Sequence, residues 1–298
     1  MKILLLGRSG QVGWDLQRSL APLGEVIALD RCSTELCGDL ADLAGISATV
    51  RQVRPDVIVN AAAYTAVDKA EGDVATAHLV NAEAPSALAE AANAVGAWLV
   101  HYSTDYVFDG SGSKPWKESD PTGPLNVYGR TKLEGEQRIA ARCAKHLILR
   151  TSWVYAARGG NFAKTMLRLA RERDRLSVID DQFGAPTGAD LLADLTAHMV
   201  RSALSGTTGD LAGIYHAAAA GETSWHGYAR FVVDYASKAG LDLKASPARV
   251  DPVPTTAFPT PATRPHNSRL NTAKLQDRFG LYFPAWQQGV ARMLTEIA

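Results

Sequence analysis

The sequence predicts an α/β protein, a doubly wound parallel sheet followed by a smaller C-terminal lobe. Short apolar runs alternate with longer helical patterns through the first 155 residues. Parallel strands need crossover connections of a dozen or more residues, and helices of this length supply them. Beyond residue 155 the alternation loosens into helices separated by irregular chain. We therefore expect one domain over residues 1–155, with later segments available to complete its sheet, and mainly a second lobe over residues 156–298.

The elements of the first half follow in the order strand, helix, strand. Apolar runs predict strands at residues 2–6, 26–29, 57–59, 98–102 and 147–149. Helical patterns predict helices at residues 11–20, 40–53 and 74–94, and a further helix through Tyr128 and Lys132. Pro55 stops the second helix and Pro85 divides the third, because proline interrupts helical hydrogen bonding. A loop rich in glycine, serine and proline covers residues 109–124.

The second half predicts helices joined by long loops. The helical patterns cover residues 162–172, 190–204, 225–239 and 286–297. The proline-rich stretch 251–265 is expected to be a loop without regular structure. Long loops in compact domains usually carry function, so this one is a candidate part of a binding site.

Composition excludes several classes of protein. The 31 basic and 31 acidic residues balance, so no net positive field favours nucleic acid or anionic membranes as partners. No apolar run approaches the roughly 20 residues of a membrane helix, and the N-terminus reads as a strand rather than a signal peptide. The 3 cysteines lack metal-ligand spacing, which fits a reducing compartment. We expect a cytoplasmic protein without a metal site.

Glycines at a three-residue spacing follow the first strand directly and open the first helix. They are Gly7, Gly10 and Gly13, with Gln11 and Val12 in the same turn. Glycine lets the backbone approach a pyrophosphate, whose charge then lies on the free N–H groups at the start of the helix. At the start of a strand-helix-strand unit, this turn predicts a Rossmann-type dinucleotide site.

Two further segments are expected to contact the dinucleotide. Asp30 ends the second strand, where a carboxylate can accept hydrogen bonds from ribose hydroxyls, and Arg31 beside it can neutralise a 2′-phosphate. This mixed chemistry predicts tolerance of both NADH and NADPH. Small residues after the third strand, including Ala62 and Ala63, permit close approach of the cofactor to the sheet edge.

A tyrosine, a lysine and a threonine form the candidate catalytic group. Tyr128 and Lys132 are four residues apart, on one face of a helix. Lys132 is expected to lower the pKa of the Tyr128 phenol and to hold the ribose, while Tyr128 gives its proton to a carbonyl oxygen that receives a hydride. Thr104 lies at the end of the fourth strand, where its hydroxyl can polarise the same carbonyl.

Taken together, these residues resemble extended short-chain dehydrogenases, and specifically the dTDP-4-dehydrorhamnose reductases. The resemblance covers nearly the whole chain. The segments that carry it are residues 7–13, 60–68, 103–110, 128–132, 150–155 and 181–187, and Arg264 and Pro265 with Ser268. It implies an NADPH- or NADH-dependent enzyme that reduces a keto group on a dTDP-linked sugar, with residues 156–298 as the substrate lobe.

The resemblance also implies site residues. The catalytic residues would be Thr104, Tyr128 and Lys132. Further cofactor contacts would fall on Gln11, Val12, Asp30, Asp39, Leu40, Ala63, Tyr64, Thr65 and Tyr102. The sugar nucleotide would contact Asp105, Tyr106 and Trp153, with the Trp153 ring either stacked on thymine or part of the core. Arg264 would bind the pyrophosphate through its guanidinium fork, or lie in a solvated loop.

Other activities on this fold stay open as alternatives. Related sugar dehydratases carry a glutamate where Tyr106 stands, which disfavours elimination chemistry. The remaining alternatives are another nucleotide-sugar epimerase or reductase of the same family and a non-catalytic regulatory subunit. The intact Thr104, Tyr128 and Lys132 argue against the regulatory subunit. Some reductases of the family dimerise through Mg²⁺ held by carboxylates. Asp15 and Asp190 could serve here, but Arg292 replaces an expected acid, so a homodimer is expected with the metal bridge in doubt.

Overall fold

A six-stranded sheet with only parallel pairings forms the centre of the larger domain. We describe residues 1–206 and 211–297 of a computed structural model. The strand order is β10-β5-β4-β3-β1-β2. The strands are β1 (Lys2–Leu6), β2 (Glu25–Leu29), β3 (Val57–Asn60), β4 (Trp98–Thr104), β5 (His146–Thr151) and β10 (Gly213–His216). The predicted parallel sheet is confirmed, and β10 shows that a segment beyond residue 155 completes it.

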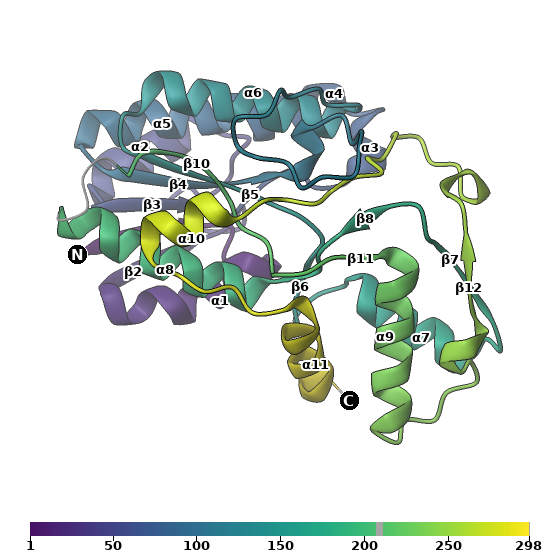
Figure 1. The fold of residues 1–298 in the computed structure, drawn as a ribbon. Helices are drawn as coiled ribbons and strands as arrows, with labels where there is room; N and C mark the ends of the chain where they lie inside the picture. Colours follow the sequence, from purple (N-terminus) through teal and green to yellow (C-terminus); the bar gives the residue numbers. More distant parts are fainter. Residues whose placement is uncertain (207–210, 298) are drawn as a thin grey trace.

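Helices cover both faces of this sheet (Figure 1). On one face lie α1 (Gln11–Leu20) and α8 (Ala189–Ser205), and on the other lie α2 (Leu43–Val53), α5 (Ala84–Val95) and α6 (Val127–Arg142). Along β1, Ile3 and Leu5 enter the core of the first face, whereas Leu4 and Leu6 enter the core of the second. Successive strand side chains point to opposite faces, so a strand covered on both sides is apolar throughout.

Two helix boundaries differ from the prediction for local reasons. The second helix begins at Leu43 rather than residue 40, because the Asp42 side chain caps it by accepting a hydrogen bond from the Gly45 N–H. The third helical stretch consists of α3 (Val67–Ala70), α4 (Val74–His78), a π-helical turn (Leu79–Glu83) and α5. Pro85 lies in the first turn of α5, so the division falls just before it.

The smaller lobe packs three helices around its own core. These are α7 (Phe162–Glu172), α9 (Trp225–Lys238) and α11 (Trp286–Ile297). Its strands form two-stranded pairs, β7 (Leu176–Ile179) with β12 (Val250–Val253), β8 (Phe183–Gly184) with β11 (Thr223–Ser224), and β6 (Val154–Tyr155) with β9 (Thr187–Gly188). The remaining short elements are α10 (Ala273–Phe279) and 3₁₀ turns at Ala21–Leu23, Asp105–Val107, Pro247–Arg249 and Thr255–Ala257.

The prediction that residues 251–265 lack regular structure is wrong at their start. β12 covers Val250–Val253 and includes Pro252, which a strand with only one partner tolerates because one of its edges needs no hydrogen bonds. From there the chain returns to the larger domain (Figure 1). The Asn126 amide donates to the Thr263 carbonyl at 2.8 Å, and the Asn267 N–H donates to the Gly110 carbonyl at 3.0 Å. Within the described residues, none of the helices combines the length and apolar character needed to span a bilayer.

Candidate active site

The strand order reverses direction between β1 and β3, and ligands of doubly wound sheets bind outside the carboxyl ends of strands at such a point. Gly7 lies there with φ of +90°, a conformation that favours glycine. A Cβ on Gly7 would come within 2.7 Å of the Ala62 nitrogen, and one on Gly13 within 2.0 Å of the Gly7 carbonyl oxygen. Because glycine has no Cβ, β1, α1 and the segment after β3 can approach one another this closely.

The start of α1 suits the pyrophosphate of a dinucleotide. Gly10 precedes the helix in an extended conformation and caps it with no side chain, so the N–H groups of the first turn remain available to an anion. The Gln11 side-chain oxygen is buried without a hydrogen-bond partner among the described residues. Val12 packs against the core below. The turn therefore fits a nicotinamide dinucleotide.

Arg8 lies beside Asp30, an interaction that the sequence analysis missed. Its guanidinium donates to the Asp30 carboxylate at 3.0 Å and to the Ala28 carbonyl at 3.3 Å. This contact is the main reason that the pKa of Asp30 falls below its usual range. Arg31, the predicted neutralising residue, is exposed. The cation that pairs with the Asp30 carboxylate is therefore a residue of the glycine turn.

The segment after β3 is held in place by buried amides. The Asn60 side chain accepts a hydrogen bond from the Ala62 N–H at 3.1 Å. The Asn81 amide accepts from the Tyr64 N–H at 2.9 Å and donates to the Tyr64 carbonyl at 3.0 Å. Ala63 lies between the two anchored residues and is half-buried, whereas Thr65 follows Tyr64 and is exposed. Asn81 was missed because its partners are distant in sequence, although the π-helical turn around it is a frequent mark of function.

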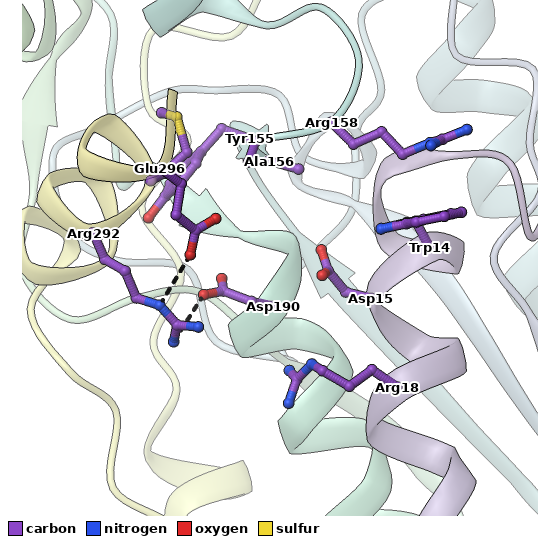
Figure 2. Close-up of a pocket in the computed structure, with 11 residues that line it drawn as sticks. Trp14, Asp15, Arg18, Tyr155, Ala156, Arg158, Asp190, Arg292 and Glu296 are labelled. Atoms are coloured by element: carbon purple, nitrogen blue, oxygen red, sulfur yellow. Dashed lines mark ion pairs between the residues drawn. The ribbon is translucent and has the colours of Figure 1, made fainter. Parts of the chain in front are cut away.

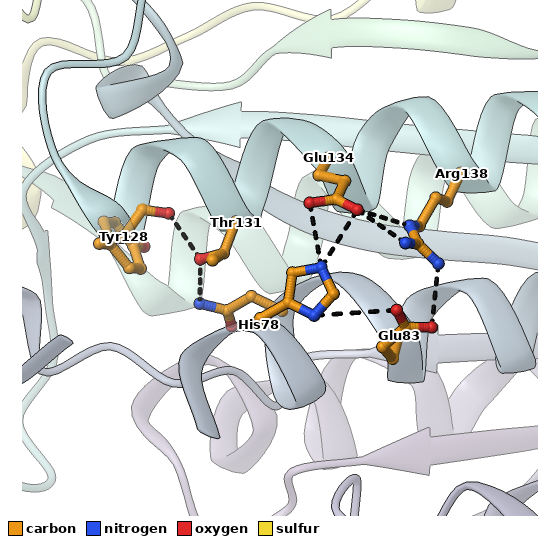
Figure 3. Close-up of polar contacts among 7 residues, drawn as sticks. His78, Glu83, Tyr128, Thr131, Glu134 and Arg138 are labelled. Carbon is orange, nitrogen blue, oxygen red and sulfur yellow. Dashed lines mark hydrogen bonds and ion pairs between the residues drawn. The ribbon is translucent and has the colours of Figure 1, made fainter. Parts of the chain in front are cut away.

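Asn81 also ties this segment to the helix that carries Tyr128. Its amide donates to the Thr131 hydroxyl at 3.2 Å, and that hydroxyl donates to the Tyr128 carbonyl at 3.0 Å (Figure 3). Farther along the same helices, Figure 3 shows a surface cluster of His78, Glu83, Glu134 and Arg138 joined by ion pairs. This cluster fastens α4 and the π-helical turn to α6. The segment after β3 and the helix that carries Tyr128 are therefore held as one unit.

Thr104, Asp105 and Tyr128 meet at the end of β4. The Thr104 hydroxyl donates to the Asp105 carboxylate at 3.0 Å. Burial raises the pKa of Tyr128 to about 12, and a hydrogen bond with Thr104 opposes that rise. Burial also raises the pKa of Asp105 to about 6, and side-chain hydrogen bonds with Ser268 and Thr104 oppose that rise. An acceptor of this kind suits a ligand hydroxyl.

Lys132 is fully buried and turned toward the sheet. Its ammonium contacts the Tyr102 carbonyl at 2.6 Å and the His101 ring at 3.0 Å. Burial lowers the pKa of Lys132 to about 8. The expectation that Lys132 lowers the pKa of Tyr128 is not met by the protein itself, because burial of the phenol is the largest effect and the ammonium is engaged by β4.

Four other predicted site residues have neighbours within the protein. The Tyr102 phenol points to the opposite face of the sheet, where it contacts the Thr196 hydroxyl at 2.5 Å, so only its carbonyl faces Lys132. The Tyr106 ring packs edge-on against Tyr128, with centroids 5.6 Å apart. Asp39 caps the Ala41 N–H at 3.0 Å, and the neighbouring Leu40 is buried.

Trp153 and Arg264 have protein partners. The Trp153 ring stacks on Trp225 with centroids 3.7 Å apart and planes inclined by 14°. Trp153 also has φ of +48°, unusual for a bulky residue, so its position is enforced by the surrounding chain. Arg264 directs its fork to Asp68, with distances of 3.1 Å and 2.7 Å to the two carboxylate oxygens. The predicted contacts of both residues with a sugar nucleotide remain predictions.

Comparison with known proteins shows which family this chain belongs to. The family model described as RmlD substrate binding domain matches residues 1–298. The chain belongs to this family. It is 61% identical over 297 residues to the dTDP-4-dehydrorhamnose reductase of Escherichia coli (strain K12), covering 100% of this chain and 98% of that one. It is 48% identical over 299 residues to that of Burkholderia thailandensis, covering 100% and 99%.

Solved structures give the same answer for the fold. The RmlD family chain superposes on a dTDP-4-dehydrorhamnose reductase from Clostridium acetobutylicum with a TM-score of 0.87 and 35% identity, covering 100% of this chain and 99% of that one. It superposes on the Bacillus anthracis dTDP-4-dehydrorhamnose reductase in complex with NADP with a TM-score of 0.88 and 33% identity, covering 99% of each. A nicotinamide cofactor in this fold agrees with the glycine turn.

The metal bridge implied by the RmlD family resemblance does not fit this chain. Asp15 and Asp190 line a cavity of about 320 Å³ together with Arg292 and Glu296 (Figure 2). The Arg292 guanidinium lies 3.6 Å from Asp190 and 3.4 Å from Glu296. Over residues 1–206 and 211–297, the histidine, cysteine and acidic side chains form no group of three suited to a metal ion. A cation is already supplied here by the arginine.

Proposed function

We propose that this protein reduces the C4 keto group of dTDP-4-dehydro-L-rhamnose to give dTDP-L-rhamnose, with hydride from NADPH or NADH and a proton from Tyr128. One observation carries the proposal. The Thr104 and Tyr128 hydroxyls interact at the end of β4, and Lys132 is buried on the backbone of the same strand, in a chain 61% identical to a dTDP-4-dehydrorhamnose reductase.

Tyr128 is the proton donor. With a pKa of about 12, the phenol keeps its proton at neutral pH and is available as an acid. The reduced nicotinamide, when bound, supplies a hydride to the carbonyl carbon. The carbonyl π electrons then move to oxygen, and an alkoxide is a stronger base than a phenolate, so the proton transfer from Tyr128 runs downhill. Tyr128 regains its proton from solvent before the next turnover.

Thr104 and Asp105 hold the substrate in the reactive position. The Thr104 hydroxyl contacts Tyr128 and can share the carbonyl oxygen with it. The buried Asp105 carboxylate, which also interacts with the Ser268 hydroxyl, offers an acceptor to a sugar hydroxyl. The sugar would lie between these groups and Tyr106, and Trp153 and Arg264 would contact the nucleotide.

The cofactor would be held along the edge from α1 to α6. Gly7, Gly10 and Gly13, with Gln11 and Val12 at the helix start, would hold the pyrophosphate. Asp30 and Lys132 would hold the ribose hydroxyls, and Arg8 and Arg31 a 2′-phosphate. Further contacts would fall on Asp39, Leu40, Ala62, Ala63, Tyr64, Thr65 and Tyr102. Because Arg8 already neutralises Asp30 at 3.0 Å, both NADPH and NADH serve as reductants.

We also propose a cytoplasmic homodimer that needs no divalent cation. The Arg292 guanidinium between Asp190 and Glu296 supports the absence of a metal bridge. Sedimentation velocity with Mg²⁺ and with a chelator tests both points. A dimer that persists in chelator supports the proposal, whereas a monomer, or a dimer that Mg²⁺ alone assembles, contradicts it.

The deciding experiment follows the near-ultraviolet absorbance of reduced nicotinamide with a panel of nucleotide keto-sugars. We expect oxidation of NADPH with dTDP-4-dehydro-L-rhamnose, and slower oxidation with a UDP-linked analogue. Oxidation only with other keto-sugars would overturn the substrate assignment. Purified protein that retains NAD and interconverts sugar epimers without net oxidation would instead identify an epimerase.

A further inference from the structure

His101 lies at the centre of the sheet, next to Lys132. It is 1% exposed and lies on β4 opposite Asn60 of β3. Its ring nitrogens contact two other buried groups, Nδ1 with the Asn60 amide nitrogen at 3.1 Å and Nε2 with the Lys132 amino nitrogen at 3.0 Å. A neutral histidine between an amide and an amine cannot keep both hydrogen bonds unchanged when the amine gains or loses a proton.

The conflict follows from counting hydrogens. The Asn60 oxygen accepts from the Ala62 N–H at 3.1 Å, so the Asn60 nitrogen donates to Nδ1 of His101. A neutral imidazole carries one hydrogen, which must then lie on Nε2 and point at the Lys132 nitrogen. That nitrogen can accept it only as a neutral amine. An ammonium at Lys132 donates to Nε2 instead and moves the His101 hydrogen to Nδ1, which requires Asn60 to present its oxygen.

We propose that His101 is a positioning residue for Lys132, whose tautomer changes with the protonation state of that lysine and is transmitted through Asn60 to the Ala62 N–H in the cofactor segment. The path has three hydrogen bonds, from Lys132 to His101, from His101 to Asn60 and from Asn60 to Ala62. The first two join adjacent elements, and the third lies within the segment that follows the end of β3. The inference deepens the proposed function, on which its kinetic part rests, by linking the charge of Lys132 to the loop that cradles the dinucleotide.

The groups around Lys132 set the pH range in which this tautomer change can be measured. The ionisable groups that face it are His101 from β4 and Glu136 from its own helix, and the Tyr102 carbonyl of β4 accepts a hydrogen bond from it. Glu136 pairs with Arg150 of β5 at 2.6 Å. Burial lowers the pKa of Lys132 to about 8, opposed by Glu136, and burial together with Lys132 holds the pKa of His101 well below its usual range. His101 therefore stays neutral while Lys132 titrates.

The direct test needs no substrate. Long-range ¹H–¹⁵N spectra of the full chain labelled with ¹⁵N-histidine distinguish the two neutral tautomers, and the His101 signal is the one missing from His101→Gln. We expect the ring hydrogen on Nδ1 below pH 7 and on Nε2 above pH 9, with a midpoint near pH 8. A single tautomer across this range, or an imidazolium at pH 7, would overturn the proposal whether or not the enzyme reduces the predicted sugar.

Matched variants test the consequence for turnover. Glutamine places an amide oxygen near the position of Nε2 and keeps an acceptor for the ammonium, whereas asparagine places its amide near Nδ1 and loses it. We expect His101→Asn to lower kcat about tenfold at pH 7.5, with KM changed less than twofold, and to move the alkaline limb of the kcat profile about one pH unit lower. His101→Gln should keep that limb within about 0.3 unit of the wild type.

A second buried histidine supplies the control. His216 ends β10 with its ring on the Trp116 carbonyl at 3.0 Å, away from Lys132. His216→Asn should lower thermal stability and leave the alkaline limb in place. If both His101 variants lost the same fraction of kcat and the alkaline limb of the kcat profile did not move, His101 would have only a structural role and the proposal would be contradicted. Absence of any NADPH oxidation by the wild type, with the tautomer change intact, would count against the proposed function alone.

Discussion

The carboxyl end of the sheet and the cavity of Figure 2 both gather ionisable groups, but they differ in burial. At the sheet end Asp105 and Lys132 are 2% and 1% exposed, and their pKa values move toward neutrality, to about 6 and about 8. In the cavity the Arg292 side chain is 65% exposed and pairs with Asp190 across 3.6 Å. Excluding water strengthens every electrostatic interaction, so the sheet end can carry chemistry whereas the cavity neutralises its own charges.

The largest effect should come from removing the Tyr128 hydroxyl, the proposed proton donor. Tyr128→Phe is expected to lower kcat by about 10²–10⁴-fold, the usual worth of general acid assistance, with KM little changed. The measurement is NADPH oxidation under saturating substrate. Tyr235→Phe is the control, since that hydroxyl contacts Thr295 on the surface of the other lobe at 2.7 Å and should leave the rate unchanged. A Tyr128→Phe enzyme with full turnover would show that the proton comes from elsewhere.

Burial of Lys132 predicts opposite pH dependences for activity and stability. Its pKa is lowered from 10.5 to about 8, so the catalytic ammonium is lost above pH 8 and kcat should fall about tenfold per pH unit there. Between pH 8 and 10.5 the unfolded chain binds more protons at this residue than the folded chain, so its contribution to the free energy of unfolding rises with pH. A pH–rate profile and urea unfolding of wild type and Lys132→Met check both signs. The assignment would be contradicted if kcat and the free energy of unfolding both declined with pH and the free energy of unfolding of Lys132→Met had the same pH slope as that of the wild type.

The features that the sequence predicted correctly are those encoded by neighbouring residues. The glycine turn, the apolar strands and the Tyr128/Lys132 spacing each lie within one segment, so periodicity and residue type suffice to find them. The same locality explains why residues 251–265 were assigned as loop. Proline and short length hide β12, whose only support is pairing with the distant β7.

The contacts that sequence reasoning missed join residues far apart in the chain. His101 and Lys132 are separated by 31 residues, and Arg264 and Asp68 by 196. A lone histidine in an apolar strand carries no signal of its function until the fold brings an amine to its ring. The direction of the Tyr128 pKa shift was wrong for the same reason, because spacing on a helix gives proximity but not which partner the ammonium chooses.

A smaller effect is expected at the edge of the cofactor site, where the charges are partly exposed. The Arg8 side chain is 45% exposed, so removing its charge should cost only about 0.5–1 kcal/mol of binding to a 2′-phosphate. We expect Arg8→Ala to lower kcat/KM for NADPH two- to fivefold and to change that for NADH less than twofold. Arg31→Ala is the matched comparison. Equal losses with both cofactors in Arg8→Ala would mean that Arg8 only orders the glycine turn.

The smallest effect belongs to the exposed cavity. Arg292→Ala should change the free energy of unfolding by less than about 1 kcal/mol, because half-exposed ion pairs contribute little. Neither Mg²⁺ nor a chelator should alter the thermal midpoint of the wild type, since the guanidinium already lies 3.6 Å from Asp190. Arg292→Glu replaces that cation with a further acid beside Asp15, Asp190 and Glu296, and oxygen ligands of this kind suit Mg²⁺. A midpoint that rises with Mg²⁺ in Arg292→Glu alone would show that one side chain decides between an internal and a bound cation, whereas a Mg²⁺ response of the wild type would refute it.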